Sequence, residues 1–449
     1  MSARTFGRLS GKLVMRRDRA PAKFRGRRFA LVAASVTVLV AAGCGGSDDD
    51  GSSGGTTTLT FVNAQDPGTF DKVIASFEAA NPTIKIKQQA VPFDDLNTTV
   101  QSRLGSKDPS IDLYDVDEPR LAAFAARGFL EPLDDLRQQA EGKIDPNALK
   151  ITTYNDKQYA MPRWTSSQLL YFNKDLLAKA KVPAPSSDPA SPMTWEDVTA
   201  AAKKAQAAGA KNGLIWDQVD RYYQLQPLAE SAGGGPGLKG DKLLEADVTN
   251  AGWTRAFTWY HSVFQEGVAP RGINPEQTPS LFANGETAFF AGGPWNSAAF
   301  DKDKTVDYGV APAPAFAGGR PATSTDSWST GISPFSKHKD AAKKFISYMT
   351  IDPTGATETT SNNIPVQKDA FRTYLDTLSA KGERYKQMAD IIEYALANTS
   401  VSRPVTVGYV DVESTMNKAF ADIRNGTAAP DRLAQANDEI NRALEKYSR

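Results

Sequence analysis

The chain has 449 residues, of which 40% are hydrophobic, and a formal net charge of zero; residues 1–43 carry +9, which leaves −9 for the remainder. An acidic body without a Lys/Arg block argues against nucleic-acid binding, which depends on cations that displace phosphate counterions. A single cysteine and two distant histidines argue against a disulfide framework and a Cys/His metal site, so we expect no metal and no cofactor.

The N-terminal region has the pattern of a signal peptide. Basic residues precede the apolar run Phe29–Ala42, whose 14 residues fall short of the roughly 20 that a membrane-spanning helix needs. The segment Ala41-Ala42-Gly43-Cys44 follows and resembles a bacterial lipobox, although Ala41 stands where Leu is usual. We therefore expect removal of residues 1–43 and lipidation of Cys44. The lipid would anchor the protein stably, because it supplies more than one acyl chain. An ordinary secretory peptide with an incidental cysteine is the alternative.

After the leader, residues 44–57 are rich in Gly, Ser, Asp and Thr and are typical of a flexible tether. The pattern then alternates between short β-branched runs and amphipathic helices. This βαβα order predicts a mainly parallel sheet with helices on both faces. The predicted strands are Leu59–Asn63, Ile84–Ile86 and Ile111–Val116, and the predicted helices contain Phe70, Val73, Ile74 and Phe77, then Leu96, Val100 and Leu104.

Further along, the chain continues with the same two kinds of element. A strand is predicted at Gln168–Phe172, and Thr194-Trp195-Glu196-Asp197 resembles a capping box that opens a helix ending at Ala208. Two later helices are predicted from their apolar stripes, which are Trp253, Phe257, Tyr260 and Phe264, and then Leu433, Ala436, Ile440 and Leu444.

Several segments, in order over nearly the whole chain after the tether, resemble the extracellular solute-binding proteins of carbohydrate ABC importers, of the family 1 type. Each motif is weak alone, and their order and spacing carry the resemblance. The segments are Phe77–Pro82 with Ile84–Ile86, Asp112–Asp117, Gly128–Leu133, Lys157–Pro162, Leu169–Leu176, Phe282–Glu286, Gly293–Trp295 and Lys339–Phe345.

The resemblance implies two α/β lobes of the periplasmic-binding-protein type, each a mainly parallel sheet flanked by helices, with a ligand cleft between them. Strands that cross between the lobes are expected near Trp164–Gln168, Ser327–Gly331 and Pro365–Val366. Lobe 1 would then comprise residues 58–164 and 328–366, and lobe 2 residues 165–327 and 367–449.

A sugar offers hydroxyl groups around its rim and C–H faces, so its site needs aromatic rings together with carboxylates, amides or Arg. Such residues follow the predicted strands or lie near the expected crossings, where the family places its cleft. Trp253 and Trp259 lie on a long helix, where packing is the more natural role. The candidate ligand-binding residues are Gln65, Asp66, Asp117, Glu118, Trp164, Ser166, Trp216, Asp217, Trp295, Asn296, Asp326, Trp328, Arg403 and Tyr409.

These residues also have structural interpretations. Asp117 and Glu118 are placed to cap a helix that opens at Pro119, and Asp66 before Pro67-Gly68 suits a turn. Trp216 and Trp295 are also compatible with core packing, and Arg403 with a surface ion pair.

Taken together, these features predict a lipid-anchored, monomeric protein on the outer face of the cytoplasmic membrane. It would bind a sugar, with a di- or oligosaccharide favoured over a monosaccharide or polyol, and deliver it to the permease subunits of an ABC importer. The alternatives are an exported glycoside hydrolase, for which Asp115 and Asp117 would be a carboxylate pair, and a ligand-sensing or adhesion lipoprotein of the same fold.

Overall fold

The computed structural model describes residues 55–302, 305–359 and 363–448. The predicted signal peptide, Cys44 and most of the predicted tether therefore lie outside the described residues. The described chain forms two lobes, each built on one sheet with its own hydrophobic cores.

The sheet of the first lobe has the strand order β2-β1-β3-β15-β6. Strands β1, β2 and β3 run parallel, whereas β15 is antiparallel to both of its neighbours. Four strands thus run one way and one runs the other way, as the prediction of a mainly parallel sheet requires. The bounds are β1 Thr57–Asn63, β2 Ile84–Ala90, β3 Leu113–Asp117, β6 Met161–Pro162 and β15 Trp328–Ile332.

The sheet of the second lobe has the order β13-β8-β12-β9, and every residue of these four strands is buried. Strand β8 is antiparallel to β12 and β13, and β12 is parallel to β9. In both sheets the reversed strand is the first one formed after the chain enters that lobe from the other. The bounds are β8 Leu169–Asn173, β9 Asn212–Trp216, β12 Thr287–Gly292 and β13 Tyr308–Pro312.

The helices of the first lobe bury the apolar stripes that the sequence predicted. Val73 and Phe77 are buried, and Phe77 packs edge-on against Phe345 with ring centroids 5.0 Å apart. Phe70 is buried as well, but it precedes the first helix as its N-cap residue. The helices are α1 Asp71–Ala80, α2 Phe93–Gly105, α3 Leu121–Ala126, α4 Asp134–Ala140, α5 Pro146–Ile151, α12 Lys339–Thr350 and α13 Pro353–Glu358.

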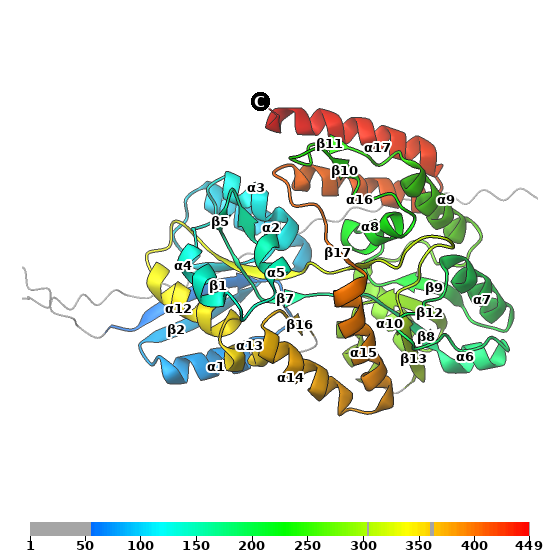
Figure 1. The fold of residues 1–449 in the computed structure, drawn as a ribbon, viewed down its shortest axis with the longest axis horizontal. Helices are drawn as coiled ribbons and strands as arrows, with labels where there is room; N and C mark the ends of the chain where they lie inside the picture. Colours follow the sequence, from blue (N-terminus) through cyan, green and yellow to red (C-terminus); the bar gives the residue numbers. More distant parts are fainter. Residues whose placement is uncertain (1–54, 303–304, 360–362, 449) are drawn as a thin grey trace, which may run out of the picture. The chain divides into compact units, whose positions relative to one another are not determined.

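The helices of the second lobe pack on both faces of its sheet, and α9, α16 and α17 pack against one another (Figure 1). Thr194 caps α7 through a hydrogen bond from Asp197 N to its hydroxyl at 3.0 Å. The helices are α6 Lys174–Lys179, α7 Trp195–Ala207, α8 Tyr222–Ser231, α9 Ala251–Gln265, α10 Thr278–Ala283, α11 Ser297–Lys302, α14 Lys368–Ser379, α15 Glu383–Asn398, α16 Tyr409–Asn425 and α17 Ala429–Leu444.

Short ladders and 3-10 turns complete the described chain. The two-stranded ladders pair β4 Thr153–Tyr154 with β5 Lys157–Gln158, β7 Trp164–Thr165 with β16 Ile364–Pro365, β10 Leu238–Lys239 with β11 Glu245–Ala246, and β14 Thr323–Ser324 with β17 Ser400–Val401. The 3-10 turns are η1 Glu118–Arg120, η2 Pro275–Gln277, η3 Pro294–Asn296 and η4 Glu445–Tyr447.

The ladders β7/β16 and β14/β17 lie where the chain passes between the two sheets. The first passage runs from β6 to β8 and contains the predicted segment Trp164–Gln168. The return passage ends by Ser327, because Trp328–Ile332 is already strand β15 of the first sheet. The crossing predicted near Ser327–Gly331 was therefore placed a few residues too late, since the sequence does not show where a crossing strand begins to pair with its sheet.

Candidate functional site

A pocket of about 660 Å³ is formed by residues from both lobes. This volume lies within the range of about 300–1,000 Å³ that is typical of small-molecule sites. Its lining combines aromatic rings with charged and amide side chains. The aromatic residues are Phe93, Tyr223, Trp295 and Trp328; the charged residues are Asp66, Asp94, Asp117, Arg120, Arg221, Asp326, Arg403 and Glu413; the amides are Gln65, Asn97, Gln218, Asn363 and Asn417.

The first sheet supplies its groups at the carboxyl ends of parallel strands. Gln65 and Asp66 follow β1, and Asp117 is the last residue of β3. Trp328 begins the reversed strand β15 and pairs in register with Asp117, so an indole and a carboxylate stand on neighbouring strands. This is the edge of an α/β sheet at which ligands ordinarily bind.

The second sheet contributes Trp295 through the turn that follows β12. Trp295 lies in η3 and is half-buried, and its Nε1 donates a hydrogen bond to Asp217 Oδ2 at 2.9 Å. Asn296 Nδ2 donates to the same oxygen at 3.0 Å. Asp217 follows β9, which pairs with β12, so the sheet register brings the carboxylate beside the turn.

Arg403 forms the centre of a buried ion-pair cluster. Its Nη2 lies 2.7 Å from Asp117 Oδ1, and its Nε donates to Asp326 Oδ1 at 2.6 Å. Its Nη1 also donates to the hydroxyl of Tyr409 at 3.1 Å. Burial lowers the pKa of Arg403, but the charges of Asp117 and Asp326 outweigh it, and the net pKa is well above its ordinary value. The partners of Arg403 are thus buried acids, not the surface acid of the alternative interpretation.

A second ion pair joins the two lobes beside this cluster. Arg120, which follows β3, pairs with Glu413 of α16, and its Nε donates to Asp117 Oδ2 at 3.3 Å. Tyr409 donates its hydroxyl to Glu413 at 3.0 Å. Burial raises the pKa of Glu413, and the charge of Arg120 opposes that rise. The pocket wall is therefore fixed by charged groups from both lobes.

At another point of the pocket wall, Phe93 of α2 is 43% exposed. The guanidinium of Arg221 lies 4.5 Å from the centroid of its ring and 3.0 Å from Asp94. Phe93 also meets the ring of Trp328 edge-on, with centroids 5.7 Å apart. An exposed phenyl ring held beside an indole offers an apolar surface to a ligand.

Seven of the predicted site residues line this pocket and seven do not. Of the second group, four residues hydrogen-bond to residues that do line it: Asp217 to Trp295, Tyr409 to Arg403, Glu118 to Ser327 N, and Ser166 Oγ to the carbonyl of Asp326 at 2.8 Å. Asn296 hydrogen-bonds to Asp217 instead. Those that line it are Gln65, Asp66, Asp117, Trp295, Asp326, Trp328 and Arg403; those that do not are Glu118, Trp164, Ser166, Trp216, Asp217, Asn296 and Tyr409.

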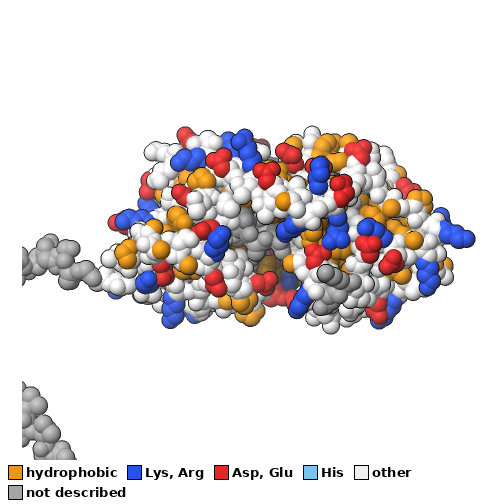
Figure 2. All heavy atoms as spheres, turned by 90° about the horizontal axis from the view of Figure 1, so that it is seen from below, with side chains coloured by type: hydrophobic (Ala, Val, Ile, Leu, Met, Phe, Trp, Pro, Cys, Tyr) orange, Lys and Arg blue, Asp and Glu red, His pale blue; other side chains and the backbone are white. Residues whose placement is uncertain are grey.

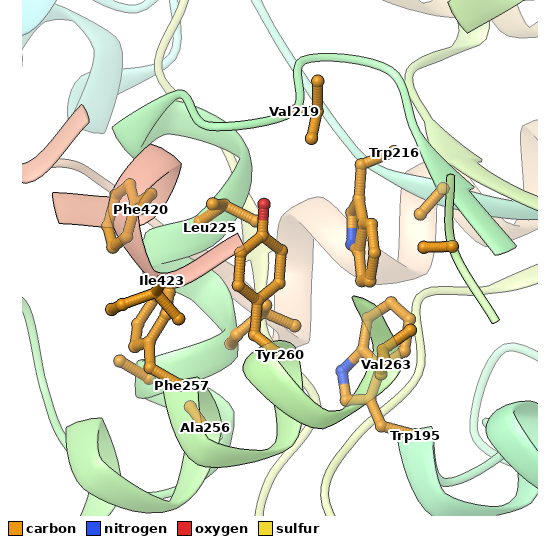
Figure 3. Packing of buried hydrophobic residues seen from close by; sticks show 14 of the residues in the cluster. Trp195, Trp216, Val219, Leu225, Ala256, Phe257, Tyr260, Val263, Phe420 and Ile423 are labelled. Atoms are coloured by element: carbon orange, nitrogen blue, oxygen red, sulfur yellow. The ribbon is translucent and has the colours of Figure 1, made fainter. Parts of the chain in front are cut away.

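Trp216 lies in the core of the second lobe. It is 1% exposed and is surrounded by the rings of Trp195, Tyr260 and Phe264, the nearest centroid being 5.3 Å away (Figure 3). A ring enclosed in this way offers no face to a ligand, and Trp216 is therefore left out of the proposed site. Core packing was the alternative interpretation of this residue.

Glu118 and Trp164 line a different, larger cavity of about 1,120 Å³. Glu118 Oε2 accepts a hydrogen bond from Ser327 N at 2.8 Å, and Trp164 stacks on Phe70 with centroids 5.9 Å apart. Asp117 makes no side-chain capping hydrogen bond to the turn at Glu118. Asp117 is thus held by its ion pairs with Arg403 and Arg120, and Glu118 by its hydrogen bond to the crossing segment at Ser327. Neither residue acts as a helix cap.

Sequence reasoning missed sixteen of the 23 residues that line the pocket, including Tyr223, Phe93 and Arg221. One signal was available, because Tyr409, Glu413 and Asn417 recur every four residues and share one face of α16. No comparable spacing marks Phe93 or Arg221, because they meet only when α2 of one lobe lies opposite the loop before α8 of the other.

One face of the protein carries charges of both signs. On the face in Figure 2, acidic and basic side chains alternate with scattered hydrophobic ones, without a large area of one sign. None of the helices within residues 55–302, 305–359 and 363–448 combines the length and hydropathy that crossing a bilayer requires.

Comparison with known proteins gives consistent matches over most of the chain. A family model described as bacterial extracellular solute-binding protein matches residues 63–353. The maltodextrin-binding protein of Bacillus subtilis is 25% identical over 341 residues, which are 72% of this chain and 76% of that protein.

Solved structures match as well. An ABC substrate-binding protein from Listeria monocytogenes, solved in complex with cycloalternan, superposes with a TM-score of 0.76 at 25% identity and covers 86% of this chain and 98% of its own. The GacH receptor of Streptomyces glaucescens, solved unliganded and with acarbose, gives a TM-score of 0.74 at 23% identity over 87% of this chain and 99% of its own.

Proposed function

This chain belongs to the bacterial extracellular solute-binding proteins, and we propose that it captures a di- or oligosaccharide in the 660 Å³ pocket and delivers it to the permease of an ABC importer. The observation that carries the proposal is the composition of that pocket. Aromatic rings from both lobes surround carboxylates and amides that are held in place. Rings cover the C–H faces of a sugar, and carboxylates and amides bind its hydroxyl groups.

The charges of the pocket favour a neutral sugar. Each lining Arg is already paired: Arg403 with Asp117 and Asp326, Arg120 with Glu413, and Arg221 with Asp94. A ligand carboxylate or phosphate would have to displace one of these acids from its arginine. The hydroxyl groups of a sugar can instead donate hydrogen bonds to the carboxylate lone pairs that the arginines leave free. Asp66, which lies on the exposed rim, adds a hydrogen-bond acceptor.

Capture is proposed to proceed by closure of the two lobes on the ligand. A sugar that touches both walls binds the closed form better than the open form and shifts the equilibrium by that difference alone. Phe93 and Arg221 come from opposite lobes and are already in contact here, so opening at the crossing segments would separate them. We propose that the moving lobes are residues 58–164 with 328–366 (lobe 1) and residues 165–327 with 367–449 (lobe 2). The last of these boundaries is supported by Val366, which packs in the core of lobe 1, and Tyr374, which packs in the core of lobe 2.

The protein is further proposed to act on the outer face of the membrane as a monomer anchored through lipid on Cys44. The signal-peptide pattern and the cysteine that follows it support this placement. No chemical reaction on the sugar is part of the proposal. Asp115, the second carboxylate of the hydrolase alternative, is 1% exposed and accepts from Arg163 at 3.0 Å and from Gln65 at 3.2 Å, so it is already engaged.

The proposal is tested by measuring binding of a panel that contains maltotriose, galactotriose, cellotriose, glucose and mannitol. At least one neutral sugar should raise the melting temperature and bind saturably by calorimetry, because a ligand that binds only the folded state stabilises it. The bound sugar should be recovered intact by mass spectrometry after prolonged incubation. Cleavage of the sugar, or no binding by any member, would overturn the proposal.

A further inference from the structure

Asp217 lies behind the pocket wall, not in it, yet it contacts Trp295, one of two tryptophans that line the pocket. Its side chain is buried, and its Oδ2 accepts hydrogen bonds from Trp295 Nε1 at 2.9 Å and from Asn296 Nδ2 at 3.0 Å. Trp295 lines the pocket and Asp217 does not. Asp217 therefore acts on a ligand only through Trp295.

The backbone of Asp217 is held firmly enough to make its carboxylate a fixed point. Its N–H donates to the carbonyl of Ala291 at 2.9 Å, and its own carbonyl accepts from the hydroxyl of Thr278 at 2.7 Å. The side chain of Trp216, one residue earlier, is locked in the lobe core. The carboxylate thus extends from the end of a strand that is buried along its whole length.

The ring of Trp295 is restrained on a second side by Gly293. A Cβ at Gly293 would collide with the six-membered part of the indole, so the ring packs directly on the backbone of that glycine. Tyr223 stands beside it, with ring centroids 6.5 Å apart. With one edge bonded to Asp217 and the indole packed on Gly293, the ring is held in one orientation before any ligand arrives. A preorganised ring loses less freedom on binding.

We propose that Asp217 is a positioning residue, whose ionised carboxylate holds the indole of Trp295 in its ligand-covering orientation and whose protonation loosens that ring and weakens sugar binding. The inference rests on the proposed function for its effect on affinity. Its structural part, the coupling of Asp217 to the indole of Trp295, does not.

The ionisation of Asp217 falls in an accessible pH range. Burial raises its pKa to about 6, against the opposing effects of the hydrogen bonds from Asn296 and Trp295 and of the charge of Arg221. The buried hydroxyl of Tyr171 on β8 also interacts with Asp217, and it stays protonated because burial raises its pKa well above the ordinary value. Above pH 6 both hydrogen bonds are charge-assisted, and below pH 6 they become weaker neutral bonds.

The structural part is tested without a ligand, on the indole N–H signals in an NMR spectrum of the ¹⁵N-labelled protein. The signal of Trp295, assigned by its absence in Trp295→Phe, should shift with pH with a midpoint near 6 and should not titrate in Asp217→Asn. Asp220→Asn is the matched control, because Asp220 lies in the same loop and its pKa is also raised by burial, while its partners are Arg424 and Tyr260. A Trp295 indole N–H signal whose chemical shift does not change between pH 5 and pH 8 would overturn the proposal.

The functional part is tested with the tightest-binding sugar of the panel. Its affinity for the unaltered protein should fall by about 5- to 10-fold between pH 8 and pH 5, since two charge-assisted bonds are weakened. Asp217→Asn should bind at the weaker level at both pH values, and Trp295→Phe, which lacks the indole donor, should also lose the pH dependence. Asp220→Asn should retain it.

The two proposals fail in different ways. If no sugar of the panel binds but the Trp295 signal titrates near pH 6, the proposed function fails and the coupling stands. If a sugar binds with an affinity that Asp217→Asn leaves unchanged at pH 8, the positioning role fails and the proposed function stands.

Discussion

Two large cavities formed by the described residues differ in how their charged groups are held as well as in size. Both have aromatic and charged side chains in their walls, and the cavity of about 1,120 Å³ adds aliphatic ones such as Leu243, Leu396 and Val405. In the pocket of about 660 Å³, every lining arginine is paired with an acid. Adjacent residues of the crossing segments separate them: Thr325 lines the larger cavity and Asp326 the smaller. The two cavities therefore lie on opposite sides of the same segments.

This difference shows that volume does not identify a site. Specific binding needs a few polar groups held in fixed directions, and the smaller pocket has them because each of its Arg residues is tied to an acid. In the larger cavity, Glu118 Oε1 and Trp164 Nε1 are buried polar atoms without a hydrogen-bond partner among the described residues. We therefore expect substitutions in the wall of the smaller pocket to change its ion-pair cluster or the sugar affinity, and substitutions at the larger cavity to leave the sugar affinity unchanged.

The largest effect is expected from Arg403→Met, which keeps most of the side-chain volume and removes the charge. Asp326 would then be buried without its cation and Asp117 would keep only the longer contact with Arg120, which costs roughly 3–5 kcal/mol of unfolding free energy. Chemical denaturation measures the change. Arg255→Met breaks a half-exposed ion pair with Glu196 and should cost less than about 1 kcal/mol. Equal losses in the two variants would show that the buried cluster is not the stabilising feature of the smaller pocket.

The next effect is on affinity. Trp295→Ala removes an aromatic wall of the smaller pocket and should weaken binding of the best panel sugar at least tenfold, or about 1.4 kcal/mol, by calorimetry. Trp253→Phe is the control, since Trp253 is buried in the second-lobe core; it should lower the melting temperature and leave affinity unchanged. Unchanged affinity in Trp295→Ala would remove this residue from the site.

A smaller effect is expected from Glu118→Gln at the larger cavity. Burial raises the pKa of Glu118 well above its ordinary value, and Asp326 and Asp117 add to the rise while Arg403 opposes it. The stability that Glu118 contributes is therefore present at acid pH and is lost as pH rises through its folded-state pKa. The variant should match the unaltered protein near pH 4 and exceed it near pH 8, by on the order of 1 kcal/mol. A variant that is less stable at pH 8 would contradict this prediction.

The smallest effect is expected from Phe371→Ala, which enlarges the larger cavity. Phe371 lines that cavity and is absent from the wall of the smaller pocket. Affinity for the panel sugar should stay within about twofold, because a change of less than about 0.4 kcal/mol leaves binding nearly constant. A loss as large as that of Trp295→Ala would mean that the larger cavity belongs to the binding site.

Much of the architecture was predictable because helices and buried strands leave periodic patterns in the sequence. The stripes of α9 and α17 are buried where the spacing predicted, and the mainly parallel sheets agree with the βαβα order. The return crossing was placed a few residues too late, because a strand was expected near Ser327–Gly331 but only its pairing shows that it already belongs to the first sheet from Trp328 onward.

Within the candidate site, position after a strand was a better guide than residue type. Trp216 is the last residue of β9 and packs in the core, whereas Trp295 lies in the turn η3 after β12 and lines the pocket. The sequence did not distinguish them, because both indoles stand near the end of a predicted strand and no local pattern marks which of them the core encloses.

The sequence by itself determined the two-sheet α/β framework and the family, since hydrophobic periodicity and ordered motifs are properties of the chain alone. Only the tertiary structure decided that Arg403 neutralises Asp117 across 286 positions of the chain, and that Asp217 supports an indole instead of touching a ligand. The physical reason is that ion pairing and burial depend on atoms brought together by folding, at sequence separations for which no local pattern exists.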